Sequence, residues 1–349
     1  MSPLLTLILR KRGQALNCGS AVRMAFLSSS VYFALGIPLV AAGYWMFRVF
    51  FVNGAACKSK ARLDGKTVVI TGANTGIGKE TAIDLASRGG RIILGCRNVQ
   101  RGEKACSEIR EKSGRENVFF RQLDLASCKS IRSFAERILT EEKEINILIN
   151  NAGIMMVPYQ LTEDGFESQF GVNHLGHVLL TYLLLDRIKE SAPSRIINVA
   201  SFGHQYGSLD FRRHAVEERY SSGLAYTRSK LANVMFTREL AKRLSGSDVT
   251  VFSLHPGAIY TELGRHLLTG YLAPLIPLVR VAMWLFTKTA KQGAQTSIHC
   301  AVAKEVEGIS GKYWDSCAVN KSSARSMNDD DCLRLWDLSC QLLGIDSDW

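Results

Sequence analysis

The stretch that decides the fold is Lys66-Thr67-Val68-Val69-Ile70-Thr71-Gly72-Ala73-Asn74-Thr75-Gly76-Ile77-Gly78-Lys79. Its β-branched run, residues 67–70, predicts a buried strand, and the apolar period from Ile77 onward predicts a helix. A Gly-rich turn between them aims backbone N–H groups and the positive end of the helix dipole at one place, which favours an anion. The spacing Gly-x-x-x-Gly-x-Gly differs from the general dinucleotide fingerprint, so this stretch alone also fits a plain strand–turn–helix.

Short apolar strands alternate with segments of helical period from residue 63 onward. The candidate strands are residues 67–71, 91–96, 118–123, 146–150, 195–199, 249–254 and 312–314. This alternation predicts a parallel sheet with helices on both faces, that is, a single α/β domain of the Rossmann-type doubly wound class. Ligands of such sheets bind at the carboxyl ends of the strands.

The charge of the chain is concentrated at its N-terminus. Net charge is +11 over 349 residues, and residues 1–63 hold eight of the 43 Lys and Arg residues but none of the 32 acidic ones. The remainder has no basic stripe with interleaved aromatic residues, which disfavours nucleic-acid binding. The nine cysteines form no C-x-x-C pair, and no His/Cys cluster has metal-ligand spacing. We therefore expect reduced thiols and no metal site.

An uncharged stretch, residues 24–47, is long enough to cross a hydrocarbon core of roughly 30 Å. Tyr44, Trp45 and Arg48 at its end are typical of a membrane interface. The expected organisation is a basic tail (1–23), a transmembrane anchor (24–47), a linker (48–62) and the α/β domain (63–349). A removed leader, including a mitochondrial one, is the alternative, because the first 25 residues carry Arg and no acid.

A second apolar stretch, residues 267–286, is interrupted by Gly270, Pro274, Pro277 and Arg280, which argues against a membrane span. Two interpretations stay open for it. It is either a surface helix packed on the core or a lid over an apolar substrate pocket.

Tyr226 and Lys230 lie four residues apart in a segment of helical period, so both project from one helix face. A phenol has a pKa near 10, and a neighbouring cation lowers that pKa. Such a pair can exchange a proton with a carbonyl or alcohol oxygen. Three strand ends carry further turn-forming or hydroxyl residues: Asn150-Asn151-Ala152-Gly153, Ala200-Ser201 and His255-Pro256-Gly257-Ala258. Singly these are ordinary caps and turns, but together they predict a site.

As a set, these motifs resemble the classical short-chain dehydrogenase/reductase family over about residues 63–316. The resemblance implies that Tyr226 is the general acid–base, that Lys230 lowers its pKa and binds the nicotinamide ribose, and that Ser201 positions the substrate oxygen. Asn173 would support a water relay to Lys230. The implied cofactor contacts are Gly72, Asn74, Thr75, Gly76, Ile77, Gly78, Arg97, Asp124, Asn151, Ala152, Gly153, Tyr226, Lys230, Pro256, Gly257 and Thr261.

The choice of cofactor is predicted from the end of the second strand, Gly95-Cys96-Arg97-Asn98. Enzymes that use NAD usually place an acid there to bond the ribose hydroxyls. Here that acid is missing, and Arg97 is placed to hold a 2′-phosphate. The sequence therefore predicts NADP(H), and by the resemblance Asp124 would contact the adenine.

Within the family, the sequence is similar to the membrane-anchored retinol dehydrogenases, in residues 73–82, 171–176, 230–244, 291–301 and 334–340. That resemblance implies hydride transfer between NADP(H) and a lipophilic retinoid at the endoplasmic reticulum membrane, with the mitochondrial membrane as the alternative. Two other functions stay open: a reductase of steroids, other ketones or lipid-derived aldehydes, and a scaffold that binds NADPH without turnover. A homodimer also stays open.

Overall fold

The computed structural model describes residues 40–48, 52–209, 220–259 and 285–349. The chain divides into two units, Met1–Asn53 and Gly54–Trp349. In the first unit, residues 40–47 are helical, and Arg48 donates a hydrogen bond of 3.0 Å to the Tyr44 hydroxyl. Most of the predicted anchor, residues 24–39, lies outside the described residues. Among the helices that are described, none has both the length and the apolar character needed to cross a membrane.

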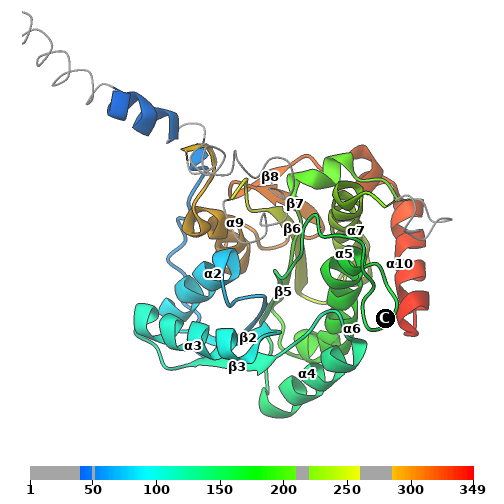
Figure 1. The fold of residues 1–349 in the computed structure, drawn as a ribbon. Helices are drawn as coiled ribbons and strands as arrows, with labels where there is room; N and C mark the ends of the chain where they lie inside the picture. The colour runs from blue at the N-terminus through cyan, green and yellow to red at the C-terminus, as the bar shows by residue number, and fades with distance from the viewer. Residues whose placement is uncertain (1–39, 49–51, 210–219, 260–284) are drawn as a thin grey trace, which may run out of the picture. The chain divides into compact units, whose positions relative to one another are not determined.

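One eight-stranded sheet forms the centre of the second unit, in the order β3-β2-β1-β4-β5-β6-β7-β8 (Figure 1). The strands are β1 (Thr67–Thr71), β2 (Arg91–Cys96), β3 (Val118–Gln122), β4 (Ile147–Asn150), β5 (Ser194–Val199), β6 (Val249–His255), β7 (Lys312–Asp315) and β8 (Ala318–Asn320). Every neighbouring pair from β3 to β7 is parallel, and β8 alone is antiparallel to its neighbour. The chain leaves β1 towards β3 and then returns to β4 on the other side. The topological switch point is therefore between β1 and β4.

Helices cover both faces of this sheet (Figure 1). One face packs against α2 (Gly76–Ser87), α3 (Val99–Ser113) and α9 (Ala290–Val302), and the other against α4 (Cys128–Glu141), α6 (Gly176–Glu190) and α7 (Ser222–Arg243). α10 (Asp329–Leu343) lies against α7. Short elements complete the chain: α5 (Ser168–Phe170), the π-helix η2 (Gly171–Leu175), and the 3-10 helices η3 (Phe202–Tyr206) and η7 (Ala324–Met327).

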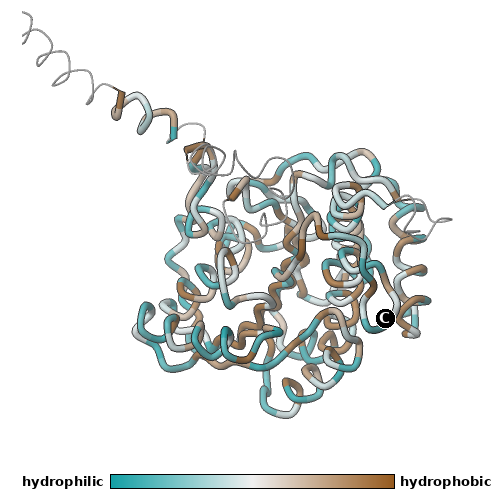
Figure 2. Tube along the Cα trace, in the orientation of Figure 1, coloured by the Kyte–Doolittle hydropathy of each residue, from teal (hydrophilic) through white to brown (hydrophobic). Residues whose placement is uncertain are grey.

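The strand sequences explain why the sheet is central. All five residues of β1 are buried, and Val68 and Ile70 join one core while Val69 joins the other. Successive strand side chains point to opposite faces, so a strand covered on both sides must be apolar throughout. Figure 2 shows the apolar residues along the strands and the polar ones along the outer faces of the helices. The predicted doubly wound parallel sheet is confirmed.

Three details of the structure do not follow from the sequence patterns. β8 was not expected, because its three residues are exposed and show no apolar pattern. α7 begins at Ser222, before Tyr226, and its N-cap Ser221 accepts from the N–H of Leu224. Asn173 lies in a π-helix rather than in a regular α-helix. Of the second apolar stretch, residues 267–284 lie outside the part of the chain that the structure describes.

Candidate active site

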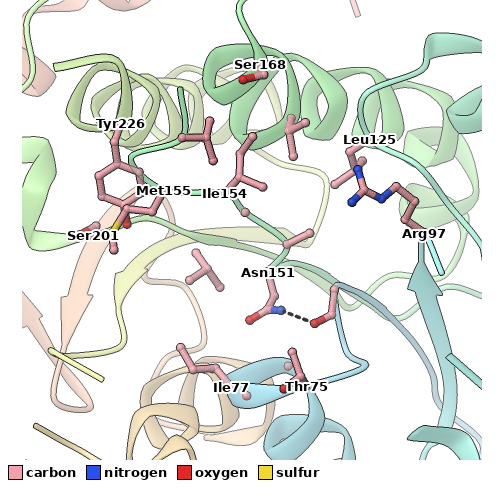
Figure 3. A pocket seen from close by; sticks show the side chains of 18 of the residues that line it. Thr75, Ile77, Arg97, Leu125, Asn151, Ile154, Met155, Ser168, Ser201 and Tyr226 are labelled. Atoms are coloured by element: carbon pink, nitrogen blue, oxygen red, sulfur yellow. Dashed lines mark hydrogen bonds between the residues drawn. The ribbon is translucent and has the colours of Figure 1, made fainter. Parts of the chain in front are cut away.

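A crevice of about 1220 Å³ opens at the carboxyl ends of the strands (Figure 3). Its position at the switch point between β1 and β4 is where doubly wound sheets bind ligands. Its walls include fifteen of the predicted cofactor contacts: Gly72, Asn74, Thr75, Gly76, Ile77, Gly78, Arg97, Asp124, Asn151, Ala152, Gly153, Tyr226, Lys230, Pro256 and Gly257. The sixteenth, Thr261, lies outside the described residues.

The glycine turn after β1 fits tightly against the end of β4. Gly72 has φ +67°, and a Cβ on it would lie 2.8 Å from the Cα of Ala152. A Cβ on Gly78 would lie 2.5 Å from the Asn151 amide nitrogen. Thr75, at the start of α2, makes no side-chain bond to the helix, so the first amides of α2 have no side-chain cap. Uncapped amides at a helix start beside bare glycines favour a phosphate, which fits the pyrophosphate of a dinucleotide.

Thr71 joins three parts of the site through its hydroxyl. The oxygen accepts from the N–H groups of Asn151 and Ala152, both at 2.9 Å, and lies 2.9 Å from Nε2 of His177. Because the oxygen already accepts twice, its hydrogen goes to His177 Nε2, and Nδ1–H of His177 then donates to the carbonyl of Asn173 at 3.1 Å. Burial lowers the pKa of His177 to about 3, so the ring is neutral.

Lys230 is buried at the other end of the crevice. Its ammonium group donates to the backbone carbonyl of Val199, at the end of β5, at 2.9 Å. Burial lowers the pKa of Lys230 to about 8. A Cβ on Gly153 would lie 3.5 Å from Nζ of Lys230, an ordinary contact, and 3.2 Å from Oδ1 of Asn173, a tight one, so a larger residue here would press on Asn173.

Asn173 uses its side chain to hold the chain that follows β4. Its Oδ1 accepts from the N–H of Ile154 at 2.8 Å, and its Nδ2 donates to the carbonyl of Ile154 and to the hydroxyl of Ser229, both at 2.9 Å. The side chain is fully buried. Asn173 therefore stabilises the crevice wall beside Lys230, and a π-helical turn at such a place is frequently part of a functional site.

Tyr226 and Ser201 point towards each other in Figure 3. Burial raises the pKa of the Tyr226 phenol, and the smaller effect of its hydrogen bond with Ser201 lowers it. The spacing of the two residues predicts a phenol pKa that is lowered by Lys230. In this structure the pKa is raised instead, because burial is the larger cause, and Nζ of Lys230 donates to Val199 and lies 5.8 Å from the centre of the phenol ring.

The opposite end of the crevice is open to solvent. Arg97 follows β2, is exposed and lines the crevice (Figure 3). Asp124 follows β3 and is half-buried, and its Oδ1 accepts from the N–H of Ala126 at 3.0 Å. This bond is an ordinary turn interaction, so the geometry accounts for Asp124 with or without an adenine.

An apolar wall lies beside Tyr226 that no sequence pattern predicts. It consists of Ile154, Met155, Val157, Pro158 and Leu161. The neighbouring Met156 has φ +51°, an uncommon conformation for this residue type, and its N–H donates to Oε1 of Gln169 at 2.8 Å. The segment is neither helix nor strand, so no periodicity reveals it. Its composition suits an apolar substrate.

Comparison with known proteins agrees with this geometry. The family model described as short chain dehydrogenase matches residues 66–271. Human retinol dehydrogenase 12 is 54% identical over 298 residues, covering 85% of this chain and 92% of that protein. Human retinol dehydrogenase 13 is 50% identical over 300 residues, covering 85% and 90%. A crystal structure of a protein of unknown function from Mycobacterium paratuberculosis is 34% identical with a TM-score of 0.68, covering 84% of this chain and 98% of that one.

Proposed function

The chain belongs to the short-chain dehydrogenase family and is an oxidoreductase with retinol dehydrogenases among its relatives, and we propose a specific activity for it. It interconverts retinol and retinal with NADP(H). The observation that carries the proposal is the shared crevice: Tyr226 and Ser201 face each other beside an apolar wall, and the uncapped glycine turn lies at the same strand ends.

The cofactor follows from the family and from the residues at the open end. Enzymes of this family use nicotinamide dinucleotides. Gly72, Gly76 and Gly78 would hold the pyrophosphate, and Lys230 the nicotinamide ribose. We propose NADP(H) over NAD(H) because Arg97 replaces the acid that would bond a free ribose. When bound, the nicotinamide supplies or accepts the hydride at the substrate carbon.

The protein's part in the reaction is proton transfer and orientation. In reduction, the Tyr226 hydroxyl gives its proton to the carbonyl oxygen as the carbon gains the hydride, so the product is the alcohol. In oxidation the phenolate takes the proton back. The Ser201 hydroxyl donates to the same oxygen and holds it against Tyr226. The ammonium of Lys230 stabilises the phenolate that forms, and its pKa of about 8 keeps it mostly charged at neutral pH.

The membrane setting is also part of the proposal. Residues 24–47 would anchor the chain in the endoplasmic reticulum membrane, where a retinoid is dissolved. The apolar wall from Ile154 to Leu161 would then receive a substrate that leaves the bilayer. Microscopy of the tagged chain tests whether it is located in the endoplasmic reticulum or in the mitochondrion.

The test is NADPH-dependent reduction of all-trans-retinal by the full-length chain and by Tyr226→Phe. Proton transfer is worth about 10² to 10⁴ in rate, so we expect kcat to fall by that factor while the Kd for NADPH changes less than twofold. Undiminished turnover by Tyr226→Phe overturns the assignment.

The substrate class is tested by measuring nonanal and a steroid ketone beside retinal. Faster turnover of either one replaces the retinoid as substrate, and no NADPH oxidation with any of them leaves only a cofactor-binding scaffold.

A further inference from the structure

Residues 201–207, which follow β5, are hydrogen-bonded to a C-terminal segment, residues 321–325, which we name the brace. Three hydrogen bonds join the two. Nε2 of His204 accepts from the N–H of Ser323 at 3.1 Å, the Gln205 amide donates to the carbonyl of Lys321 at 3.3 Å, and Arg325 donates to the carbonyl of Gly207 at 2.7 Å. The brace lies outside the residues that match the family model, which end at 271.

His204 connects the brace directly to Ser201. Its ring is fully buried, and Nδ1 lies 2.7 Å from the Ser201 carbonyl. A carbonyl only accepts, so Nδ1 carries the hydrogen, and the Ser323 N–H only donates, so Nε2 is bare. Burial lowers the pKa of His204, so the neutral ring that these two bonds require is the form present. The ring also packs on Tyr313, with the ring centres 4.5 Å apart.

The bond from His204 matters for Ser201 because the Ser201 hydroxyl is itself hydrogen-bonded to the same loop. Ser201 is the N-cap of η3, and its Oγ accepts from the N–H of Gly203 at 3.1 Å. This bond directs the hydroxyl hydrogen away from η3. A Cβ on Gly203 would lie 3.5 Å from that Oγ and 3.6 Å from the Tyr226 ring, so the loop and the phenol are packed together. A shift of the loop therefore moves Ser201 relative to Tyr226.

We propose that His204, held by the Ser323 N–H, is a positioning residue that keeps the Ser201 hydroxyl aimed at the oxygen shared with Tyr226. This inference rests on the proposed function, in which Ser201 and Tyr226 hold the substrate oxygen. The C-terminal brace thereby contributes to catalysis at a distance from the crevice. Misplacement of a reacting group by about 1 Å can reduce a rate about 10²-fold, so a partial loosening is expected to reduce kcat about tenfold.

The test compares Ser323→Pro with Ser323→Ala in the full-length chain. Ser323 has φ −64° and ψ 149°, dihedral angles that proline adopts, and the proline Cδ replaces the N–H hydrogen that faces His204, so this variant both removes the bond and displaces the buried ring. Both variants lose the Ser323 hydroxyl, which accepts from the N–H of Ser326 at 3.3 Å, but only the proline also removes the N–H that His204 accepts. We expect kcat for retinal to be about tenfold lower in Ser323→Pro than in Ser323→Ala, with the Kd for NADPH equal in both. Equal kcat values in the two variants overturn the inference.

A second arm uses His204→Phe, which keeps a ring against Tyr313 and removes both hydrogen bonds. The double variant His204→Phe/Ser323→Pro is expected to have the same kcat as His204→Phe, because the bond is already lost. If the double variant instead has a kcat lowered by the product of the two single losses, then Ser323→Pro acts through something other than its bond to His204, for example poor folding. That result contradicts the inference. Tyr226→Phe distinguishes failure of the His204 role from failure of the proposed function. If it is inactive while both Ser323 variants have equal kcat, only the role of His204 fails; if it is active, the proposed function fails.

Discussion

The two ends of the crevice differ in how closely their polar side chains are bound into the fold. At the Tyr226 end, Lys230 is buried and bonded to Val199, and Asn173 is buried and bonded to Ile154. At the other end Arg97 is exposed just after the carboxyl end of β2. The polar groups at the first end are buried and hydrogen-bonded as core residues are, whereas Arg97 at the second end is solvated as an ordinary surface residue is.

Because of this difference in burial, we expect the Tyr226 end to determine the reaction rate and the Arg97 end to determine the cofactor affinity. Burial shifts the pKa of Tyr226 upwards and that of Lys230 downwards, so the fold bears an energetic cost for the charged form of each group, which at neutral pH is the ammonium of Lys230. An exposed guanidinium has no such cost, because water solvates it when no ligand is bound. Substitutions at the buried end should therefore change both rate and stability, and substitutions at the open end should change cofactor affinity alone.

Lys230→Met tests the buried end and should have the largest effect. Removal of the ammonium leaves the phenolate unstabilised, and we expect kcat to fall about 10³-fold. Stability should move the other way. A fall in pKa from 10.5 to about 8 corresponds to roughly 3 kcal/mol of destabilisation while the amine is charged in both states. Loss of the bond to Val199 offsets about 1 kcal/mol of the relief, so we expect a net gain of about 2 kcal/mol.

The pH dependence supplies the control for Lys230→Met. Because the folded-state pKa is the lower one, the destabilisation by Lys230 is complete below pH 8 and disappears as the pH rises towards 10.5. The advantage of the Met variant in urea unfolding should therefore be larger at pH 7 than at pH 9.5. A variant that is less stable than the wild type at pH 7 would show that Lys230 is not an energetic burden, and the contrast between the two ends would fail.

Arg97→Glu tests the open end. Charge-assisted hydrogen bonds to a 2′-phosphate are worth about 1.5 to 3 kcal/mol, so we expect the Kd for NADPH to rise by one to two powers of ten. The Kd for NADH, which lacks that phosphate, should change less than about threefold. The unfolding midpoint in urea should stay the same, because exposed substitutions usually alter stability by less than about 0.5 kcal/mol. Equal weakening of both cofactors would argue against a 2′-phosphate contact.

The sheet was largely predictable because its strands are apolar on both faces. The predicted residues 67–71 and 91–96 coincide with β1 and β2, whose side chains are almost all buried. The exposed β8 and the π-helix at Asn173 leave no periodic trace in the sequence. Contacts between distant residues are also invisible to it: His204 and Ser323 are 119 positions apart, and no spacing rule joins them.

Electrostatics in the site show the same limit. The spacing of Tyr226 and Lys230 predicts that they share a helix face, and both line the crevice. The direction of the phenol pKa depends on two facts that spacing does not contain, namely the burial of Tyr226 and its hydrogen bond with Ser201. Residue identity thus predicted which groups meet, and only their surroundings decide the proton affinity of each.

Asp124 is half-buried, which places it between the buried Lys230 and the exposed Arg97. Its substitution is expected to have the smallest effect of the three. Asp124→Asn keeps an oxygen to accept from the N–H of Ala126, whereas Asp124→Ala removes it. If the carboxylate contacts adenine, Asp124→Asn should weaken NADPH and NADH alike, by about two- to threefold, since a neutral acceptor bonds less strongly than a charged one. Its urea midpoint should match the wild type, while Asp124→Ala should lose about 1 kcal/mol of stability. Unchanged affinity for both cofactors in Asp124→Asn, measured by fluorescence titration, would make Asp124 a turn residue and place the adenine contact elsewhere.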